Sequence, residues 1–330
     1  MAVTIPENKT SPLLKARDAV WNPTPGSLRF LALLGVVVNA GIVLTGGAVR
    51  LTKSGLGCPT WPKCTGESLL PNSSPEHSPL NMAIEFGNRT LTFLVLAVGI
   101  AVYVAARRLS PNRPELTRLA LWQPVGVVVQ AGVGGLTVLT KLHPTMVSPH
   151  YLLSIALIFV AFLLYVRAGE GDGPVRRLVE PLVHRLTLAL VWVVVAVLAV
   201  GTFVTGSGPH AGDAEATRLP FPITDITRIH SLLAWATVGL TVALLVLHRR
   251  TGAPAGVRRA GLLLLGAILL QGVIGYVQYF LGVPELLVGA HVLGSTLLWI
   301  AALNLLYSGR TRPAPAAPAG TPAPAAARRP

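Results

Sequence analysis

The sequence is poor in charge, in cysteine and in aromatic residues. Only 12% of its 330 residues are Asp, Glu, Lys or Arg, whereas 52% are hydrophobic, and there are two cysteines. A soluble domain carries roughly twice this charged fraction, because its surface must face water. The composition therefore excludes a soluble enzyme and a disordered protein, and the low cysteine count excludes a disulfide-rich secreted module.

The hydrophobic residues gather in eight stretches of 17–22 residues without a single Asp, Glu, Lys or Arg. These stretches are 30–49, 90–106, 119–140, 150–166, 186–205, 229–247, 260–281 and 286–307. A helix of this length spans about 30 Å of hydrocarbon, whereas a transmembrane β-strand is about half as long and alternates polar with apolar residues. The sequence therefore predicts an all-α membrane protein with eight transmembrane helices.

Lysine and arginine predict the orientation of these helices. The two terminal tails and alternate loops carry 20 of the 27 basic residues, and the remaining seven lie on the opposite side. Because basic residues favour cytoplasmic loops, we expect a bacterial plasma-membrane protein with both termini in the cytoplasm. Orientation accounts for the net charge of +14, so the sequence calls for no nucleic-acid partner.

The two halves of the chain resemble each other. Gln130 precedes His150 by 20 residues, and Gln271 precedes His291 by the same number. Each half has four spans, so both copies have the same orientation, which predicts parallel repeats related by a pseudo-two-fold axis along the membrane normal. We expect two four-helix bundles side by side. The expected segments are 1–27 (cytoplasmic tail), 28–168 (N-terminal bundle with a long outer loop at 50–88), 169–185 (cytoplasmic linker), 186–309 (C-terminal bundle) and 310–330 (unstructured Pro/Ala-rich tail).

Three histidines are expected at the outer starts of helices: His150, His230 and His291. Asn88 takes the fourth equivalent place, 62 residues before His150, while His230 and His291 are 61 residues apart. Two imidazoles on opposite helices of a bundle can hold a haem between them, so the spacing predicts haem between His230 and His291. Zinc is the competitor, although only Asp225, expected in a loop, lies near enough to join them. A single histidine at a membrane surface is usually just an interfacial polar residue.

A carboxylate, an amide and a guanidinium precede the second span. Glu85, Asn88 and Arg89 fall at i, i+3 and i+4, so they share one face if the stretch is helical. They would then point into the mouth of the N-terminal bundle; the alternative is a helix-start carboxylate in a surface ion pair. The C-terminal copy has Thr227 at the matching offset. We therefore expect one bundle to hold a prosthetic group and the other to perform chemistry.

The only cysteines, Cys58 and Cys64, lie in the first outer loop. Five residues separate them, two of which are prolines. Their expected position outside the membrane favours a disulfide. A redox-active thiol pair and a metal site are the alternatives.

Taken together, these residues resemble the haem A synthase family, membrane enzymes that convert haem O to haem A. The likeness covers about residues 30–307. It is carried by the motif GGAVRLTKSGLGCPTWPKC at 46–64, the stretch 85–89, the motif QAGVGGLTV at 130–138 and the repeated histidines. The first motif includes the cysteine pair that the family carries in its outer loop.

The resemblance implies that His230 and His291 are the axial ligands of a haem b cofactor in the C-terminal bundle. It also implies that the N-terminal bundle holds the substrate haem through His150, with Glu85 in the catalytic role and Arg89 beside it. The implied reaction oxidises one ring methyl of haem O to a formyl group, through an alcohol intermediate, for the biogenesis of cytochrome oxidase.

One position departs from the family. Members usually carry a histidine where this chain has Asn88, and asparagine is a poor haem ligand. Either the substrate iron is five-coordinate through His150, or a loop residue such as His77 takes the second position, or the chain has lost the reaction. His143 is the other loop histidine within reach of this site.

The implied partners are haem O, the haem O synthase that supplies it, and membrane lipid. The electron partner is unidentified, and the chain could also form a homo-oligomer.

Two other classes of protein are alternatives to this enzyme. A dihaem electron carrier of cytochrome b type would bind haem in both halves without converting haem O. A transporter with parallel repeats would bind no haem, and the lack of charge within the spans counts against it.

Overall fold

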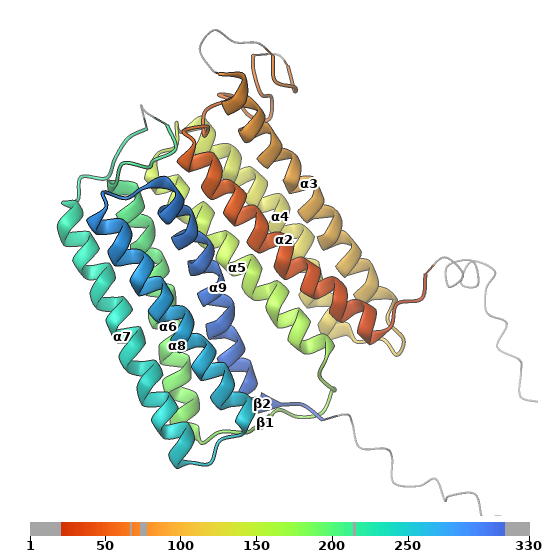
Figure 1. Ribbon diagram of the computed structural model, residues 1–330. Helices are drawn as coiled ribbons and strands as arrows, with labels where there is room; N and C mark the ends of the chain where they lie inside the picture. The colour runs from red at the N-terminus through yellow and green to blue at the C-terminus, as the bar shows by residue number, and fades with distance from the viewer. Residues whose placement is uncertain (1–20, 67, 73–77, 214–215, 314–330) are drawn as a thin grey trace, which may run out of the picture.

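The computed structural model describes residues 21–66, 68–72, 78–213 and 216–313. Within these ranges the chain forms eight long helices and one short β-pair (Figure 1). The elements are α2 (Pro25–Leu51), α3 (Pro79–Arg108), α4 (Pro114–Leu139), α5 (Pro144–Ala168), β1 (Arg176–Arg177), α6 (Pro181–Ser207), α7 (Ile223–Arg250), α8 (Ala255–Phe280), α9 (Glu285–Ser308) and β2 (Arg310–Thr311). All eight helices are long and apolar enough to cross a membrane, which confirms the prediction of an all-helical, multi-pass membrane protein.

Prolines mark where the helices begin. Five helices have proline at their first position, and the other three directly follow a proline. Proline suits the first turn because its fixed φ is helical and its missing N–H needs no partner there. The helices therefore start before the charge-free stretches. His150, His230 and His291, expected at helix starts, lie about two turns inside their helices.

The eight helices form two four-helix bundles. In the first, each of α2, α3, α4 and α5 packs against its sequence neighbours, and α2 closes the set against α5; in the second, α6 to α9 do the same. Consequently α3 and α5 are diagonal to each other, as are α7 and α9. The bundles meet through α2 and α5 on one side and α6 and α9 on the other. These neighbour pairs correspond between the halves, as a duplication predicts; the pseudo-two-fold axis itself stays a prediction.

The apolar core is continuous between the bundles. Its largest cluster draws buried residues from α2, α5, α6, α7, α8 and α9. Hydrogen bonds cross the same boundary: Trp299 Nε1 donates to the carbonyl of Ile155 at 3.1 Å, and the hydroxyls of Tyr151 and Ser295 are 3.1 Å apart. The outward faces carry large exposed apolar side chains such as Trp192, as a surface in contact with lipid requires.

The two ends of the molecule differ in what they carry. The loops that connect α2–α3, α4–α5, α6–α7 and α8–α9 gather at one end, which we call the histidine end, and the β-pair lies at the other, the strand end (Figure 1). At the strand end, Arg176 lies opposite Thr311 and Arg177 opposite Arg310 in an antiparallel ladder. The first residues of the segment expected as an unstructured tail are thus paired with the linker; 314–330 lie outside the described residues.

Candidate functional site

His230 of α7 and His291 of α9 face each other across the C-terminal bundle. Their ring centroids are 6.3 Å apart, and the ring planes make an angle of 67°. His230 is the eighth residue of its helix and His291 the seventh. At 1.5 Å per residue both therefore lie about 10 Å inside the helix starts. Because α7 and α9 are diagonal helices, the two imidazoles meet in the interior of the bundle.

Each of these imidazoles rests against a glycine of the preceding helix. A Cβ on Gly201 of α6 would lie 3.2 Å from Cε1 of His230, and one on Gly275 of α8 would lie 3.4 Å from Cε1 of His291. In both cases Nδ1 is the next ring atom, at 3.6 and 3.9 Å. The Nδ1–Cε1 edge therefore faces the glycine, and Nε2 is the nitrogen turned away from it.

The donor set and its spacing fit haem iron. Two imidazoles that bind one metal ion from opposite sides have centroids about 6 Å apart, since each metal–nitrogen bond is about 2 Å long. The observed separation of 6.3 Å agrees with this arrangement.

Zinc fits the pair less well. No group of three or more His, Cys, Asp or Glu side chains able to hold a metal ion occurs within the described ranges, whereas zinc takes at least three protein ligands. Asp225 was expected in a loop, but it lies in the first turn of α7, and its side chain is mostly exposed beside Arg228. Haem needs two axial ligands only, and the pair supplies two.

The N-terminal half has one imidazole where the C-terminal half has two. His150 of α5 packs against Gly134 of α4, whose Cβ would lie 3.0 Å from Cε1 of the ring, and its Nδ1 is buried without a partner among the described residues. On α3, diagonal to α5, the side-chain oxygen of Asn88 accepts a hydrogen bond from the Thr45 hydroxyl of α2 at 2.7 Å. This half therefore offers one strong axial ligand.

The repeated glutamines tie neighbouring helices together in both halves. Gln130 Nε2 donates to the carbonyl of His150 at 2.7 Å and to the hydroxyl of Ser154 at 2.5 Å. Gln271 instead fills the space that a side chain on Gly294 of α9 would need. Gln130 thus uses hydrogen bonds to hold the turn of α5 that carries His150, whereas Gln271 holds α8 against α9 by close packing.

Glu85 and Arg89 share one face of α3, as the spacing predicted, and they bind the outer loop. Oε1 of Glu85 accepts from the Arg89 guanidinium at 2.6 Å, and Oε2 accepts from the backbone N–H of Cys58 at 2.6 Å. Arg89 also donates to the carbonyls of Cys58, Thr60 and Lys63 at 2.6, 2.9 and 3.2 Å. With 4% of its surface exposed, the carboxylate is held by the loop rather than standing free in an open mouth.

Cys58 and Cys64 form a disulfide, which confirms the preferred prediction for this pair. The bridge closes the loop that the α3 ion pair holds. Trp61, between the cysteines, lies against α4, where a Cβ on Gly135 would come within 2.4 Å of its ring. The loop therefore contacts both α3 and α4 at the histidine end of the N-terminal bundle.

Three further histidines were weighed from the sequence. His143 caps the start of α5, with Nδ1 2.8 Å from the Thr145 hydroxyl, and His77 lies outside the described residues. His248 lies in the last turn of α7, where it is fully buried beside Gly261 of α8.

The sequence did not single out Thr45, Gly134 or Gly201, whereas Gly275 belongs to a group of small residues expected to leave room beside His291. Nothing in the spacing pairs Thr45 with Asn88, because they lie on different helices. Gly134 and Gly275 do carry a signal: each follows the repeated glutamine by four residues, which places it one helical turn further on.

Comparison with known proteins places the chain in a family. The cytochrome oxidase assembly protein family, COX15-CtaA, matches residues 29–303. The heme A synthase of Symbiobacterium thermophilum is 31% identical over 147 residues, which cover 44% of this chain and 46% of that protein. The corresponding protein of Shewanella oneidensis is 27% identical over 214 residues (60% and 61%), and that of Staphylococcus haemolyticus is 25% identical over 182 residues (54% and 58%).

The chain spans between 46% and 61% of the length of these relatives. The family match, by contrast, runs from α2 into α9 and includes both histidine-bearing bundles and the disulfide loop. The chain therefore belongs to the cytochrome oxidase assembly protein family COX15-CtaA.

Proposed function

We propose that the chain is an oxidoreductase of the heme A synthase type. It would oxidise one ring methyl of haem O to a formyl group, through an alcohol intermediate, for the assembly of cytochrome oxidase. The observation that carries the proposal is the His230–His291 pair on diagonal helices, with centroids 6.3 Å apart. The relatives named heme A synthase supply the reaction class.

In this proposal His230 and His291 hold haem b in the C-terminal bundle. Haem b held by these two residues would supply one-electron transfer. The protein fixes the two rings by resting them against Gly201 and Gly275, so that each Nε2 is left for the metal. The pair lies between diagonal helices of the bundle, and both residues are partly buried.

We assign His150 as the axial ligand of the substrate haem in the N-terminal bundle. The Asn88 side chain on the diagonal helix is bound to Thr45, and an amide is a poor iron ligand in any case. The second axial side of the substrate therefore has no strong protein ligand among the described residues.

Glu85 is our candidate for the catalytic acid–base, with Arg89 beside it. Oxidation of the alcohol to the aldehyde releases protons, which a carboxylate can accept at Oε1 or Oε2. Both oxygens receive N–H donors, from Arg89 and from Cys58. A proton arriving at Oε2 would weaken the bond to Cys58, so the proposal couples the outer loop to the chemistry.

We further propose that the histidine end faces outward from a bacterial plasma membrane and that both termini are cytoplasmic. The support is the concentration of 20 of 27 basic residues at the opposite end and in the tails. Haem O, which is itself membrane-soluble, would then reach the N-terminal bundle from the haem O synthase that makes it.

A dihaem electron carrier is the second candidate. The observation in its favour is that both carboxylate oxygens of Glu85 already accept hydrogen bonds. A carboxylate bound in this way can have a purely structural role, which an electron carrier would require. It would hold haem in both halves and leave haem O unchanged.

Chromatography of extracted haems separates the two candidates. The chain is expressed in cells that make haem O, and a parallel culture expresses the His291→Ala variant. The synthase proposal expects haem A, with a smaller amount of the alcohol, from the unaltered chain only. Unchanged haem O together with a normal haem b spectrum would favour the carrier and contradict the synthase.

A further inference from the structure

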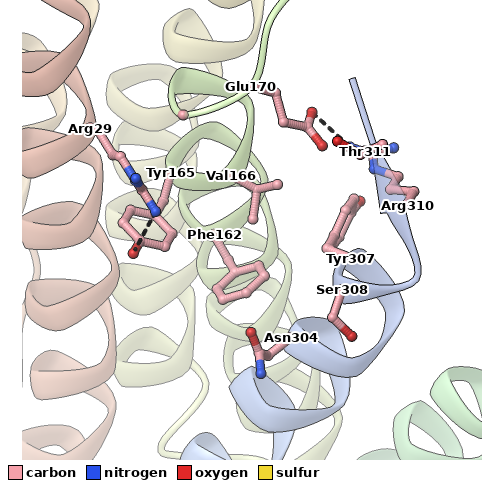
Figure 2. Close-up of a pocket in the computed structure, with 11 residues that line it drawn as sticks. Arg29, Phe162, Tyr165, Val166, Glu170, Asn304, Tyr307, Ser308, Arg310 and Thr311 are labelled. Atoms are coloured by element: carbon pink, nitrogen blue, oxygen red, sulfur yellow. Dashed lines mark hydrogen bonds and ion pairs between the residues drawn. The ribbon is translucent and has the colours of Figure 1, made fainter. Parts of the chain in front are cut away.

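A polar cavity of about 310 Å³ opens at the strand end of the molecule, between its two halves (Figure 2). Arg29 enters it from α2, Tyr165 and Glu170 come from α5 and the segment after it, and Tyr307 and Arg310 come from α9 and β2. It lies at the opposite end of the helices from the histidines, so the chemistry proposed above makes no use of it.

Two arginine–tyrosine pairs form opposite walls of this cavity (Figure 2). The Cζ of Arg29 lies 4.8 Å from the ring centroid of Tyr165, whose hydroxyl accepts a hydrogen bond from Nη2 at 3.2 Å. The Cζ of Arg310 lies 4.4 Å from the ring centroid of Tyr307. Both tyrosines stand in a Leu-Leu-Tyr sequence near the end of their helix. Stacking on the rings orients each guanidinium.

The acidic side chain in the cavity does not satisfy both arginines. Oε2 of Glu170 accepts from Arg167 at 3.0 Å and, more weakly, from Arg310 at 3.4 Å. Nε of Arg310 is buried without a hydrogen-bond partner in the described ranges. Arg29 bonds to Tyr165 and forms no ion pair within the described part of the chain. Because Arg29 is exposed and lines the cavity, its remaining N–H donors are available to an added anion.

The position of Arg29 is fixed by the fold. A Cβ on Gly169 would lie 3.0 Å from Nε of Arg29 and 3.1 Å from its Cζ, so the guanidinium rests on a residue without a side chain. Further along α5, Phe162 and Val166 line the same cavity. On the side of the membrane centre the lining is apolar on α5 and polar at Asn304 of α9, and it becomes cationic at the helix ends (Figure 2).

We propose that this cavity binds the phosphate group of an anionic phospholipid between Arg29 and Arg310. Arginine forms charge-assisted, paired hydrogen bonds with phosphate, and basic pockets between transmembrane helices bind anionic headgroups. The net positive lining disfavours a headgroup that brings its own ammonium. Because α2 and α5 belong to one half and α9 to the other, the lipid fastens the two halves together at the strand end.

Lipid titration of the purified full-length protein tests the proposal. Protein in neutral detergent is titrated with phosphatidylglycerol, phosphatidylcholine or inorganic phosphate, and bound lipid is counted by native mass spectrometry while the unfolding temperature is followed. Phosphatidylglycerol should bind and raise the unfolding temperature, whereas phosphatidylcholine should do neither. Arg29→Gln, a change at an exposed position, should weaken phosphatidylglycerol binding about tenfold, the loss expected for one charge-assisted contact.

Two matched variants control for non-specific charge. Arg259→Gln removes an exposed arginine at the same end, outside the cavity, and should bind lipid like the unaltered protein. Arg29→Lys keeps the charge but not the paired donors and should bind with intermediate affinity. Equal binding of the two lipids, or unchanged binding by Arg29→Gln, overturns the proposal. If inorganic phosphate alone raises the unfolding temperature as much as phosphatidylglycerol does, the bound phosphate group need not come from a lipid, and the proposal of a lipid site is overturned.

Discussion

The N-terminal and C-terminal bundles place different groups at the same depth. In the C-terminal bundle His230 faces His291, and no covering disulfide loop occurs over it in the described ranges. In the N-terminal bundle His150 is diagonal to Asn88, whose oxygen is bound to Thr45. The same helix plan thus places two facing imidazoles in one half and, among the described residues, one imidazole diagonal to an amide in the other.

The outer loops sharpen this difference. The N-terminal bundle is covered by the Cys58–Cys64 loop, which Glu85 and Arg89 hold from below. A duplicated plan with one covered, carboxylate-bearing site and one bis-imidazole site favours a division between chemistry and electron transfer. The following predictions test that division, from the largest expected effect to the smallest.

Loss of one ligand should empty the C-terminal site. In His291→Ala, one imidazole of the facing pair is removed, and we expect nearly complete loss of the stable haem b absorbance in the purified protein. His184→Ala, at the strand end, is the matched histidine control and should keep the spectrum. A normal haem spectrum in His291→Ala would remove this residue from its assigned role.

Loss of the carboxylate should affect only the N-terminal half. Glu85→Gln keeps the side-chain size but cannot take up a proton, so conversion of haem O should fall at least about 100-fold, the lower range for acid–base catalysis. The haem b spectrum should be unchanged. Glu115→Gln, an exposed carboxamide substitution on α4 next to Arg167, should retain activity. Full conversion of haem O by Glu85→Gln would show that the Glu85–Arg89 ion pair has a structural role only.

Restoring a histidine should make the two halves alike. Asn88→His places an imidazole diagonal to His150, and retention of the N-terminal haem should rise about tenfold or more, equivalent to 1.4 kcal/mol. Conversion of haem O should not fall, because members of the family usually carry a histidine at this position. Electron paramagnetic resonance would show a second low-spin signal. Asn88→Gln keeps the amide and should show no second low-spin signal. A second signal in Asn88→Gln, or the lack of one in Asn88→His, would contradict the account.

The smallest effect should come from the glycine behind His230. Gly201→Ala puts a methyl group 3.2 Å from Cε1 of the ring, so the imidazole must shift by a few tenths of an ångström, and haem retention should fall a few-fold. Gly272→Ala, on α8, meets nothing within 4 Å and should not change retention. Equal haem retention by Gly201→Ala and Gly272→Ala in a haem-transfer assay would show that packing against the His230 ring does not determine the affinity for haem.

The helices were predictable because a membrane imposes length and apolar composition on any segment that crosses it. The first residues of the helices were less predictable, because each helix begins before its apolar stretch, at or directly after a proline. The facing of His230 and His291 was also predictable, because the duplication repeats their spacing and diagonal helices of a bundle point residues at matching depth toward each other.

The contacts of individual polar side chains could not be predicted. The bond between Asn88 and Thr45 depends on how α2 and α3 are rotated about their own axes, which periodicity alone does not fix. The capture of Glu85 by the backbone of Cys58 depends on the path of a loop 27 residues earlier in the chain. The burial of His248 likewise depends on the packing of α8 over the end of α7.

The most direct test of the account is electron paramagnetic resonance of the purified His150→Ala protein, which keeps His230 and His291 but lacks the histidine assigned to the substrate haem. The account predicts one ferric haem per chain with a low-spin, bis-imidazole signal that disappears when His230→Ala is added. A protein without haem, or one with only a high-spin signal, would contradict it.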